Sequence, residues 1–497
     1  MNFKTKIAYT AVMATLGMAA GSAQAAYLSE VGTGQVLLYP YYTVQGGYDT
    51  YVSVVNTTSR AKAVKVRFIE AKASAEVLDF NLYLSKYDVW AAAITATTDG
   101  AKLVTSDTSC TAPMITGAVP FRNGAYVNSG TTLLDDILED GLSRTREGYI
   151  EMIEMGVPDN TANVNFTNPL LPLTFEQSVT HKAATRMPAD CAWVSAQWAP
   201  VGPGGAAPLT LTTAAPSGGL IGSATLINVA AGTDYTYDPV VIDDYSAVAQ
   251  HSRPGDLQPN LGNAGRTSVV MRRNTTTGAR EVVQSTWPTG REAISAVLSH
   301  SNVMNEYSVE AVISSGTDWV VTFPTKNLHV NRFTNLNQDV TTLPAPPFTM
   351  RARTANAGTT WLACEPVSLT IYDREEQTPN SVVDFSPQPV TGNSLCFEAN
   401  VITFNNSSVL ASSLVPLNIT TAFTSGWMNL GFNGTGQSLT NTNNTTFNAG
   451  IATTATYYGL PAVGFAVEKY VNGNVGGVLS NYGGSFIHKY VQTITTP

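Results

Sequence analysis

The chain of 497 residues is too long for one compact hydrophobic core, so its length predicts at least two domains. A net charge of −9 with only 13% charged residues argues against nucleic acid as a partner, because phosphate contacts need clustered lysine and arginine. A hydrophobic share of 43% is enough to bury a core, which argues against intrinsic disorder.

Residues 1–25 have the pattern of a secretory signal peptide. Lys4 and Lys6 precede an apolar run, residues 7–20, and Ala23-Gln24-Ala25 has the small residues of a cleavage site. A membrane anchor is the alternative, but the run is too short to cross about 30 Å of hydrocarbon as a helix. We therefore expect a chain secreted to the periplasm, the cell surface or the extracellular space of a bacterium, with no transmembrane segment.

Residues 51–90 carry the clearest strand pattern. Val64, Val66 and Phe68 alternate with Lys65 and Arg67. A period of two places the apolar set on a buried face and the charged set toward water. With polar, turn-prone linkers between such runs, the pattern predicts an antiparallel meander in one wall of a β-sandwich.

The domain boundary is expected near residues 200–219, where proline, glycine and alanine accumulate. This gives a first β-sandwich over residues 26–219 with an inserted short helix, and a second over residues 220–497. A long surface loop inside one domain is the alternative reading. The fold class that follows is all-β and mainly antiparallel, with two sandwich domains and a few short helices.

Two helices and one hairpin stand out. Residues 131–141 and 289–302 have helical spacing, the second with a predicted capping box. The strand-like segments 306–314 and 317–325 flank Ser315-Gly316, which predicts a hairpin.

An even number of cysteines in a secreted chain indicates disulfides. We expect the pairs Cys110–Cys191 and Cys364–Cys396, because each pair then stays within one half of the chain. A metal site is the alternative, but no CxxC or HxxxH spacing supports it.

Motifs for chemistry are missing, so we expect no enzyme. The sequence has no HExxH, no GxSxG, no phosphate loop and no dinucleotide fingerprint. His300 lies in the last turn of the predicted helix, where the helix C-terminus favours a cation. The acidic loop residues Asp243, Asp244 and Asp256 are candidate ligands for Ca²⁺ as a cofactor, although the sequence has no DxDxDG loop, which favours plain solvated acids.

Several aromatic residues could either stack on sugar rings or fill the sandwich cores. They are Trp287, Trp319, Trp361, Trp427, Tyr457 and Tyr458.

Two segments resemble secreted or cell-surface proteins of proteobacteria that carry no assigned activity. They read VKVRFIEAKASAEVLDFNLYLSKYDVW and HSNVMNEYSVEAVISSGTDWVVTFPTK. The resemblance implies secretion and an Ig-like, β-rich build. We therefore expect a structural or cell-surface protein, a subunit of a surface layer, fibre or matrix that binds copies of itself or other surface proteins and glycans. The alternatives are an adhesin or carbohydrate-binding module and, in third place, a hydrolase with a dispersed site.

Overall fold

The computed structural model confirms the predicted all-β class, with 48% of the chain in strands and 10% in helices. The structure describes residues 24–127, 141–202, 205, 207–273, 278–330, 344–350, 363–378, 393–443, 445–447, 450–452 and 454–496. The expected signal peptide lies outside these residues except for its last two, and the expected helix over residues 131–141 lies outside them except for Gly141.

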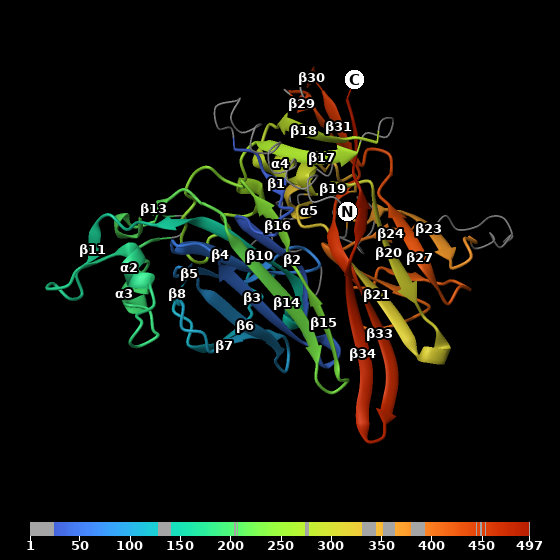
Figure 1. Ribbon diagram of the computed structural model, residues 1–497, viewed down its shortest axis with the longest axis horizontal. Coiled ribbons are helices and arrows are strands. Elements are labelled where there is room, and N and C mark those ends of the chain that lie inside the picture. The colour runs from blue at the N-terminus through green and yellow to red at the C-terminus, as the bar shows by residue number, and fades with distance from the viewer. Residues whose placement is uncertain are drawn as a thin grey trace, which may run out of the picture.

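The first half of the chain forms two antiparallel sheets that face each other (Figure 1). The strands of the first sheet are, in spatial order, β1 (Tyr27–Leu28), β16 (Val240–Asp243), β2 (Val36–Thr43), β10 (Glu147–Pro158), β4 (Lys62–Glu70), β5 (Glu76–Leu84) and β8 (Cys110–Ala112), with β13 (Thr213–Ala214) also paired to β10. The strands of the second are β15 (Thr233–Tyr237), β14 (Leu220–Asn228), β3 (Asp49–Asn56), β6 (Val89–Ala96), β7 (Ala101–Thr105) and β9 (Gly117–Pro120).

The core between these sheets follows the predicted alternation. Val64, Val66 and Phe68 of β4 lie in one buried cluster with Val52 and Val54 of β3 in the facing sheet. Because alternate side chains of a strand point to opposite faces, one apolar set from each sheet is enough to fill the space between them.

The chain returns to this sandwich after residue 219. β14 pairs with β3 over its length, and β16 pairs with β2. The expected boundary after Gly219 therefore falls inside the first sandwich, and the segment rich in proline and glycine before it is an excursion from the sandwich.

The outer face of the first sheet is buried, which corrects the expectation that Lys65 and Arg67 face water. Lys65 forms an ion pair with Asp79, and Arg67 bridges Glu76 at 2.6 Å and Glu151 at 2.5 Å. Lys62 and Glu70, at the two ends of β4 on the opposite face, are also paired, Lys62 with Glu154 at 2.8 Å and Glu70 with Arg144 at 3.0 Å. The alternation placed Lys65 and Arg67 on the correct face, but other parts of the chain cover that face.

Three segments form this cover. The helices α2 (Phe175–Val179) and α3 (Cys191–Gln197) pack over one end of the sheet, and α4 (Gly290–Leu298) packs over the other. Residues 244–260, here called the cover segment, cross the middle, where the Arg253 carbonyl accepts a hydrogen bond from Lys65 Nζ at 3.2 Å. A covered face explains why charged side chains there must be paired.

The second half contains another pair of sheets. One sheet runs β26 (Leu417–Ile419), β25 (Ala399–Phe404), β21 (Ser315–Thr322), β33 (Val463–Val475) and β34 (Val478–Ile487). The other runs β23 (Ser368–Asp373), β27 (Ser425–Gly431), β20 (Asn302–Ser308) and β35 (Lys489–Val491). Pairing is antiparallel in both except between β25 and β26.

The five-stranded sheet is apolar on both faces. Trp319 and Val321 of β21 belong to the core shared with the four-stranded sheet, whereas Val320 belongs to the core of the first sandwich. Phe465 of β33 also faces that first core, where its ring stacks on Tyr237 with a centroid distance of 4.3 Å. One continuous core therefore joins the two halves.

A third, smaller group of sheets lies on the far side of α4 (Figure 1). Its strands are β17 (Thr267–Arg273), β18 (Arg280–Thr286), β29 (Thr445–Phe447) and β30 (Gly450–Ala452) in one sheet, and β28 (Ser438–Asn441), β31 (Ala455–Tyr458) and β36 (Thr493–Thr495) in another. Two-stranded ladders complete the described sheets: β11 (Asn163–Asn165) with β12 (Leu173–Thr174), β19 (Ser299–His300) with β32 (Leu460–Pro461), and β22 (Glu365–Pro366) with β24 (Ser394–Leu395). Short helical elements are α5 (Lys326–His329) and the 3-10 turns η1 (Gln45–Gly47), η2 (Leu142–Arg146), η3 (Leu209–Leu211), η4 (Leu261–Asn263) and η5 (Ala311–Ile313).

The predicted hairpin about Ser315-Gly316 is wrong, although both strands exist. β20 pairs with β27 and β35, and β21 pairs with β25 and β33, so the two strands lie in different sheets. The turn η5 between them carries the chain from one sheet to the other.

The predicted helix begins as expected after Thr289 but ends at Leu298. The Thr289 side chain forms a hydrogen bond with the Glu292 carboxylate and does not cap a backbone N–H.

Candidate functional site

The three proposed Ca²⁺ ligands are not gathered into one group in the described part of the chain. Asp243 ends β16 and accepts a hydrogen bond from the Tyr27 hydroxyl at 3.3 Å, and Asp244 follows it with a φ of 50°. Asp256 lies in the cover segment. Burial raises the pKa of both Asp243 and Asp244. Among the described residues, no group of three or more His, Cys, Asp or Glu side chains has the arrangement to hold a metal ion.

Both predicted disulfides are confirmed. Cys110 of β8 is bonded to Cys191 at the start of α3, with a Cα–Cα distance of 5.0 Å, and Cys364 is bonded to Cys396. The first bond fastens the α2–α3 excursion to the edge of the first sheet. All four cysteines are in disulfides, so the chain has no free thiol to serve as a nucleophile or a metal ligand.

A Ser–His–Asp contact in the first sandwich bears on the hydrolase alternative. Ser85 Oγ lies 2.9 Å from His181 Nδ1, and the Asp88 carboxylate accepts hydrogen bonds from the Ser85 N–H at 2.9 Å and from Ser85 Oγ at 3.1 Å. Ser85 is buried, so a substrate cannot reach its hydroxyl. The contact braces the turn between β5 and β6, and we assign it no catalytic role.

The other four histidines are also structural. Burial lowers the pKa of His251, His300 and His488 to about 4 and that of His329 to about 3. His300 Nδ1 lies 2.9 Å from the Ala462 carbonyl, and the ring stacks on Tyr490, so both neighbours are uncharged groups of the described chain. The prediction that His300 is a cation at the end of α4 is therefore wrong. The cost of burying its charge exceeds the favourable effect of the helix dipole.

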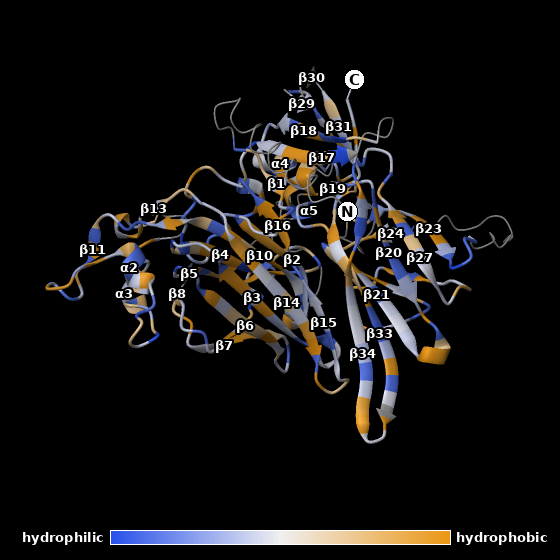
Figure 2. Cartoon of the chain, in the orientation of Figure 1, coloured by the Kyte–Doolittle hydropathy of each residue, from blue (hydrophilic) through white to orange (hydrophobic). Residues whose placement is uncertain are grey.

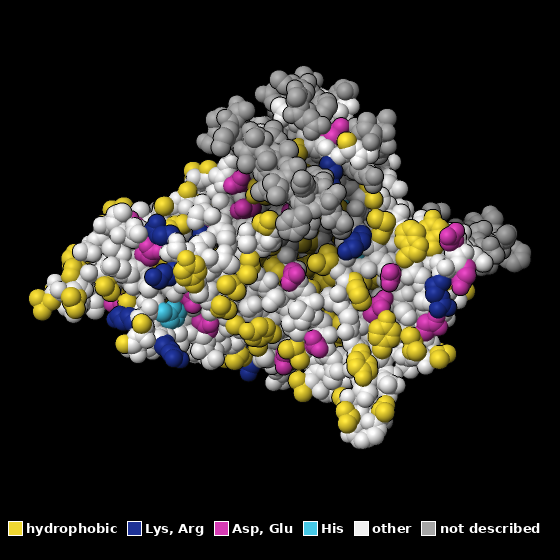
Figure 3. Space-filling view, viewed as in Figure 1, with side chains coloured by type: hydrophobic (Ala, Val, Ile, Leu, Met, Phe, Trp, Pro, Cys, Tyr) yellow, Lys and Arg dark blue, Asp and Glu magenta, His cyan; other side chains and the backbone are white. Residues whose placement is uncertain are grey.

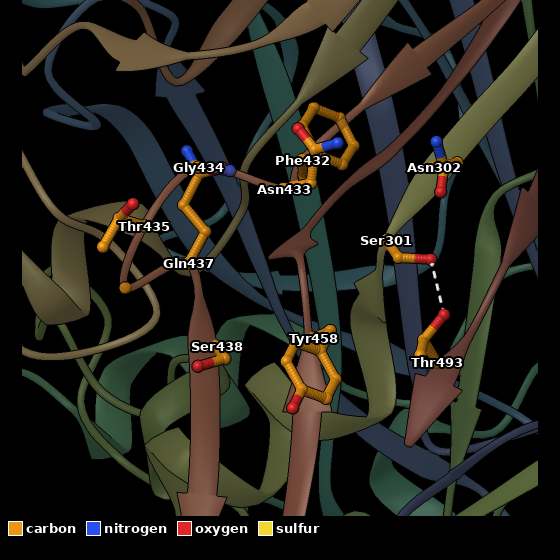
Figure 4. Close-up of a pocket in the computed structure, with 11 residues that line it drawn as sticks. Ser301, Asn302, Phe432, Asn433, Gly434, Thr435, Gln437, Ser438, Tyr458 and Thr493 are labelled. Carbon is orange, nitrogen blue, oxygen red and sulfur yellow. Dashed lines mark hydrogen bonds between the residues drawn. The ribbon is translucent and has the colours of Figure 1, made fainter. Parts of the chain in front are cut away.

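A cavity of about 440 Å³ lies where the four-stranded sheet meets the β28–β31–β36 sheet (Figure 4). Its floor is a row of three cross-strand neighbours, Ser438, Tyr458 and Thr493. The alternate row, Leu439, Tyr457 and Ile494, faces the opposite way into a buried core. The β period thus leaves a tyrosine between two small hydroxyl residues on the open side.

The walls of this cavity come from Ser301 and Asn302 at the start of β20 and from residues 432–437, which link β27 to β28. Ser301 Oγ lies 2.9 Å from Thr493 Oγ1, and Asn302 donates to the Asn429 side chain at 3.0 Å. In Figure 4 the labelled side chains surround an open centre, with Ser438 and Tyr458 on one side and Asn302 on the other.

The linking residues 432–437 are held from behind by a buried amide. Gln437 donates to the Pro366 carbonyl at 2.9 Å and to the Glu365 carboxylate at 3.1 Å, while its oxygen accepts from the Gly434 N–H at 2.8 Å. The buried Glu365 also accepts two backbone N–H groups, those of Thr349 and Met350. The wall of the cavity is therefore built before any ligand arrives.

Of the six aromatic candidates, the structure places only Tyr458 in this cavity. Trp287, Trp319 and Tyr457 are buried, and Trp361 lies outside the described residues. Trp427 is 39% exposed but stacks on Tyr372 on the outer face of β27. The sequence feature that could have identified Tyr458 is its place next to Tyr457 in a strand. Because neighbouring side chains of a strand point to opposite faces, a buried Tyr457 implies that Tyr458 points outward.

A second exposed feature is the long hairpin of β33 and β34, which extends from the body in Figure 1. Figure 2 colours residues near its end as hydrophobic, and Figure 3 shows hydrophobic side chains exposed there. We call these side chains, with one from the neighbouring β14–β15 turn, the tip patch: Val471, Val475, Val478, Leu479 and Val229. Asn481 of the hairpin donates to the Ala231 carbonyl of that turn at 2.7 Å, which fixes the two together.

The outer part of the hairpin has no charged side chain. Residues 470–487 contain no Asp, Glu, Lys, Arg or His, although Val478 is 65% exposed and Tyr482 is 62% exposed, whereas Glu468 and Lys469 of β33 lie nearer the body. Exposed edge strands of monomeric proteins normally carry charges that block pairing with another chain. This one does not, which is typical of a surface that becomes covered.

No protein-family model matches the chain, and comparisons with curated proteins and with solved structures gave no match. None of the helices in the described part of the chain is long and apolar enough to cross a bilayer.

Proposed function

We propose that the chain is a secreted structural protein of the bacterial cell surface, a subunit of a surface layer, fibre or matrix whose copies associate through the β33–β34 hairpin. The observation that carries this proposal is the outer part of the hairpin, residues 470–487, which is uncharged, partly apolar and extends from the body. The two disulfides and the leader-like N-terminus suit an oxidising space outside the cytoplasm.

A second copy of the chain is the partner that this surface fits. The chain carries a net charge of −9, so two copies repel each other over most of their surfaces. Residues 470–487 of the hairpin add no charge to that repulsion, and their exposed valine, leucine and tyrosine side chains offer apolar area to bury. Association of this kind strengthens with salt, because screening removes the repulsion without weakening the contact.

The test is the double variant Val478→Lys, Leu479→Lys. We expect wild-type protein to form dimers or larger species with rising concentration, more so at 0.5 M than at 0.05 M salt, in sedimentation velocity. The variant places two like charges in each copy of the contact, so its association should weaken by at least about tenfold.

The matched control is Leu170→Lys, which changes an 88% exposed leucine in the β11–β12 excursion of the first sandwich. It should associate as wild type does. A wild-type chain that stays monomeric at every concentration and salt, or a loss of association in the control as large as in the hairpin variant, contradicts the proposal.

A further inference from the structure

We infer that the cavity floored by Ser438, Tyr458 and Thr493 is a binding site for a neutral sugar. The inference goes beyond assembly through the hairpin, since the cavity lies on a different part of the molecule, beside the β28–β31–β36 sheet. Its volume of about 440 Å³ is within the range of about 300–1,000 Å³ found for small-molecule sites.

The charge of the wall selects the class of ligand. Among the described residues, no Asp, Glu, Lys, Arg or His lines the cavity. A phosphate, a carboxylate or an amine would lose its hydration there without gaining an opposite charge, which is costly. A neutral polar ligand pays no such penalty.

The wall also offers hydrogen-bonding groups that the protein itself does not use. The hydroxyls of Ser438, Tyr458 and Thr435 and the amide of Asn433 have no hydrogen-bond partner in the described part of the chain. Hydroxyl and amide groups both donate and accept, as sugar hydroxyls do. The hydroxyls of a polyol can therefore form hydrogen bonds with these groups either as donors or as acceptors.

Tyr458 supplies the apolar part of the recognition. Its side chain is 41% exposed, and it stands between two small residues, Ser438 and Thr493, which leave room over its ring. The C–H face of a pyranose ring can pack on such an aromatic surface while the sugar hydroxyls reach the polar wall. The bonds of Gln437 to Glu365 and Pro366 hold the wall in place, so binding costs little ordering of the chain.

The experiment uses the full mature chain. A microarray of neutral oligosaccharides built from glucose, galactose, mannose and N-acetylglucosamine, with uronic-acid and sialic-acid glycans beside them, identifies the best probe, and calorimetric titration with that probe follows. We expect binding to one or more neutral glycans. Tyr458→Ala should weaken it by about tenfold or more, and Tyr458→Phe, which keeps the ring, by only a few-fold.

Ser438→Phe, which fills the cavity from its floor, is the second variant and should abolish binding. Trp427→Ala is the matched control, because it removes an equally exposed aromatic ring outside the cavity. The hairpin variant Val478→Lys, Leu479→Lys should bind the probe as wild type does, so this test and the assembly test fail independently. No binding to any neutral glycan, a preference for acidic glycans, or equal losses in Tyr458→Ala and Trp427→Ala would overturn the inference.

Discussion

Asp318 is a buried carboxyl at the junction between the two halves of the molecule. One of its oxygens accepts the Leu410 N–H at 2.8 Å, and the other has no hydrogen-bond partner in the described chain. Burial raises the pKa of Asp318 to about 7, against the opposing effect of the Leu410 and Val409 N–H groups. A carboxyl with this pKa is largely protonated at pH 5 and largely ionised at pH 8.

The free energy of unfolding should therefore fall as pH rises through this range. The unfolded carboxyl has a pKa near 3.8, so between pH 4 and 7 unfolding releases a proton, and the stabilisation present below pH 4 is lost as the pH passes 7. A shift of this size corresponds to a few kcal/mol, at about 1.4 kcal/mol per pKa unit. Asp318→Asn removes this dependence.

Urea unfolding of wild type and Asp318→Asn at pH 5 and pH 8 measures the effect. Buried histidines also make the free energy of unfolding pH-dependent, because their lowered pKa values make stability fall as the pH drops below about 6.5. This contribution is the same in both proteins, so it cancels when their free energies of unfolding are subtracted. The variant should gain stability relative to wild type from pH 5 to pH 8. An unchanged difference would show that Asp318 does not titrate in this range.

At the scale of elements, the outer face of β4 shows what a strand pattern can and cannot predict. The alternation in residues 64–68 correctly assigned Val64, Val66 and Phe68 to the core. It could not tell that the other face is covered, because the cover comes from α2, α3, α4 and residues far along the chain. Local spacing carries no information about such distant packing.

The candidate site was harder to predict for the same reason. Tyr458 could be named as an aromatic candidate, but its neighbours Asn302 and Thr493 are separated from it by long stretches of sequence. The prediction of a hairpin about Ser315-Gly316 was wrong for the same reason. β20 pairs with β27 and β21 with β33, and both partners lie far away in the sequence. The cysteine pairs succeeded because four residues allow few pairings.

Arg67→Met should destabilise the fold strongly. The substitution keeps the length of the side chain but leaves the buried Glu76 and Glu151 without their cation. Breaking a buried pair in this way costs about 3–5 kcal/mol, whereas an exposed pair is worth about 0–1 kcal/mol. Urea unfolding at pH 7 measures the loss.

Arg374→Met is the control, because Arg374 is exposed and pairs with Glu310 at the surface. It should change the free energy of unfolding by less than about 1 kcal/mol. Equal effects of the two substitutions would mean that the buried face of the first sheet tolerates unpaired carboxylates.

At the scale of the whole molecule, the five-stranded sheet decides how the halves unfold. Its strands alternate between two cores, with Trp319 on one side and Val320 on the other, so neither half can lose its structure without exposing part of the core of the other. Interfaces between independent domains are comparatively polar, whereas residues of both halves share one apolar cluster here. We therefore expect one cooperative unit in place of two.

Calorimetry should show a single thermal transition in wild type, and Phe465→Ala and Leu82→Ala should each lower it while keeping it single. Phe465 lies in the second half and stacks on Tyr237 of the first, whereas Leu82 lies within the first sandwich. Each truncation of a buried side chain costs about 2–5 kcal/mol. If the halves were independent, Leu82→Ala would shift one of two transitions and leave the other in place. A shared core requires both substitutions to move the same transition, because the free energy that each removes belongs to the whole molecule.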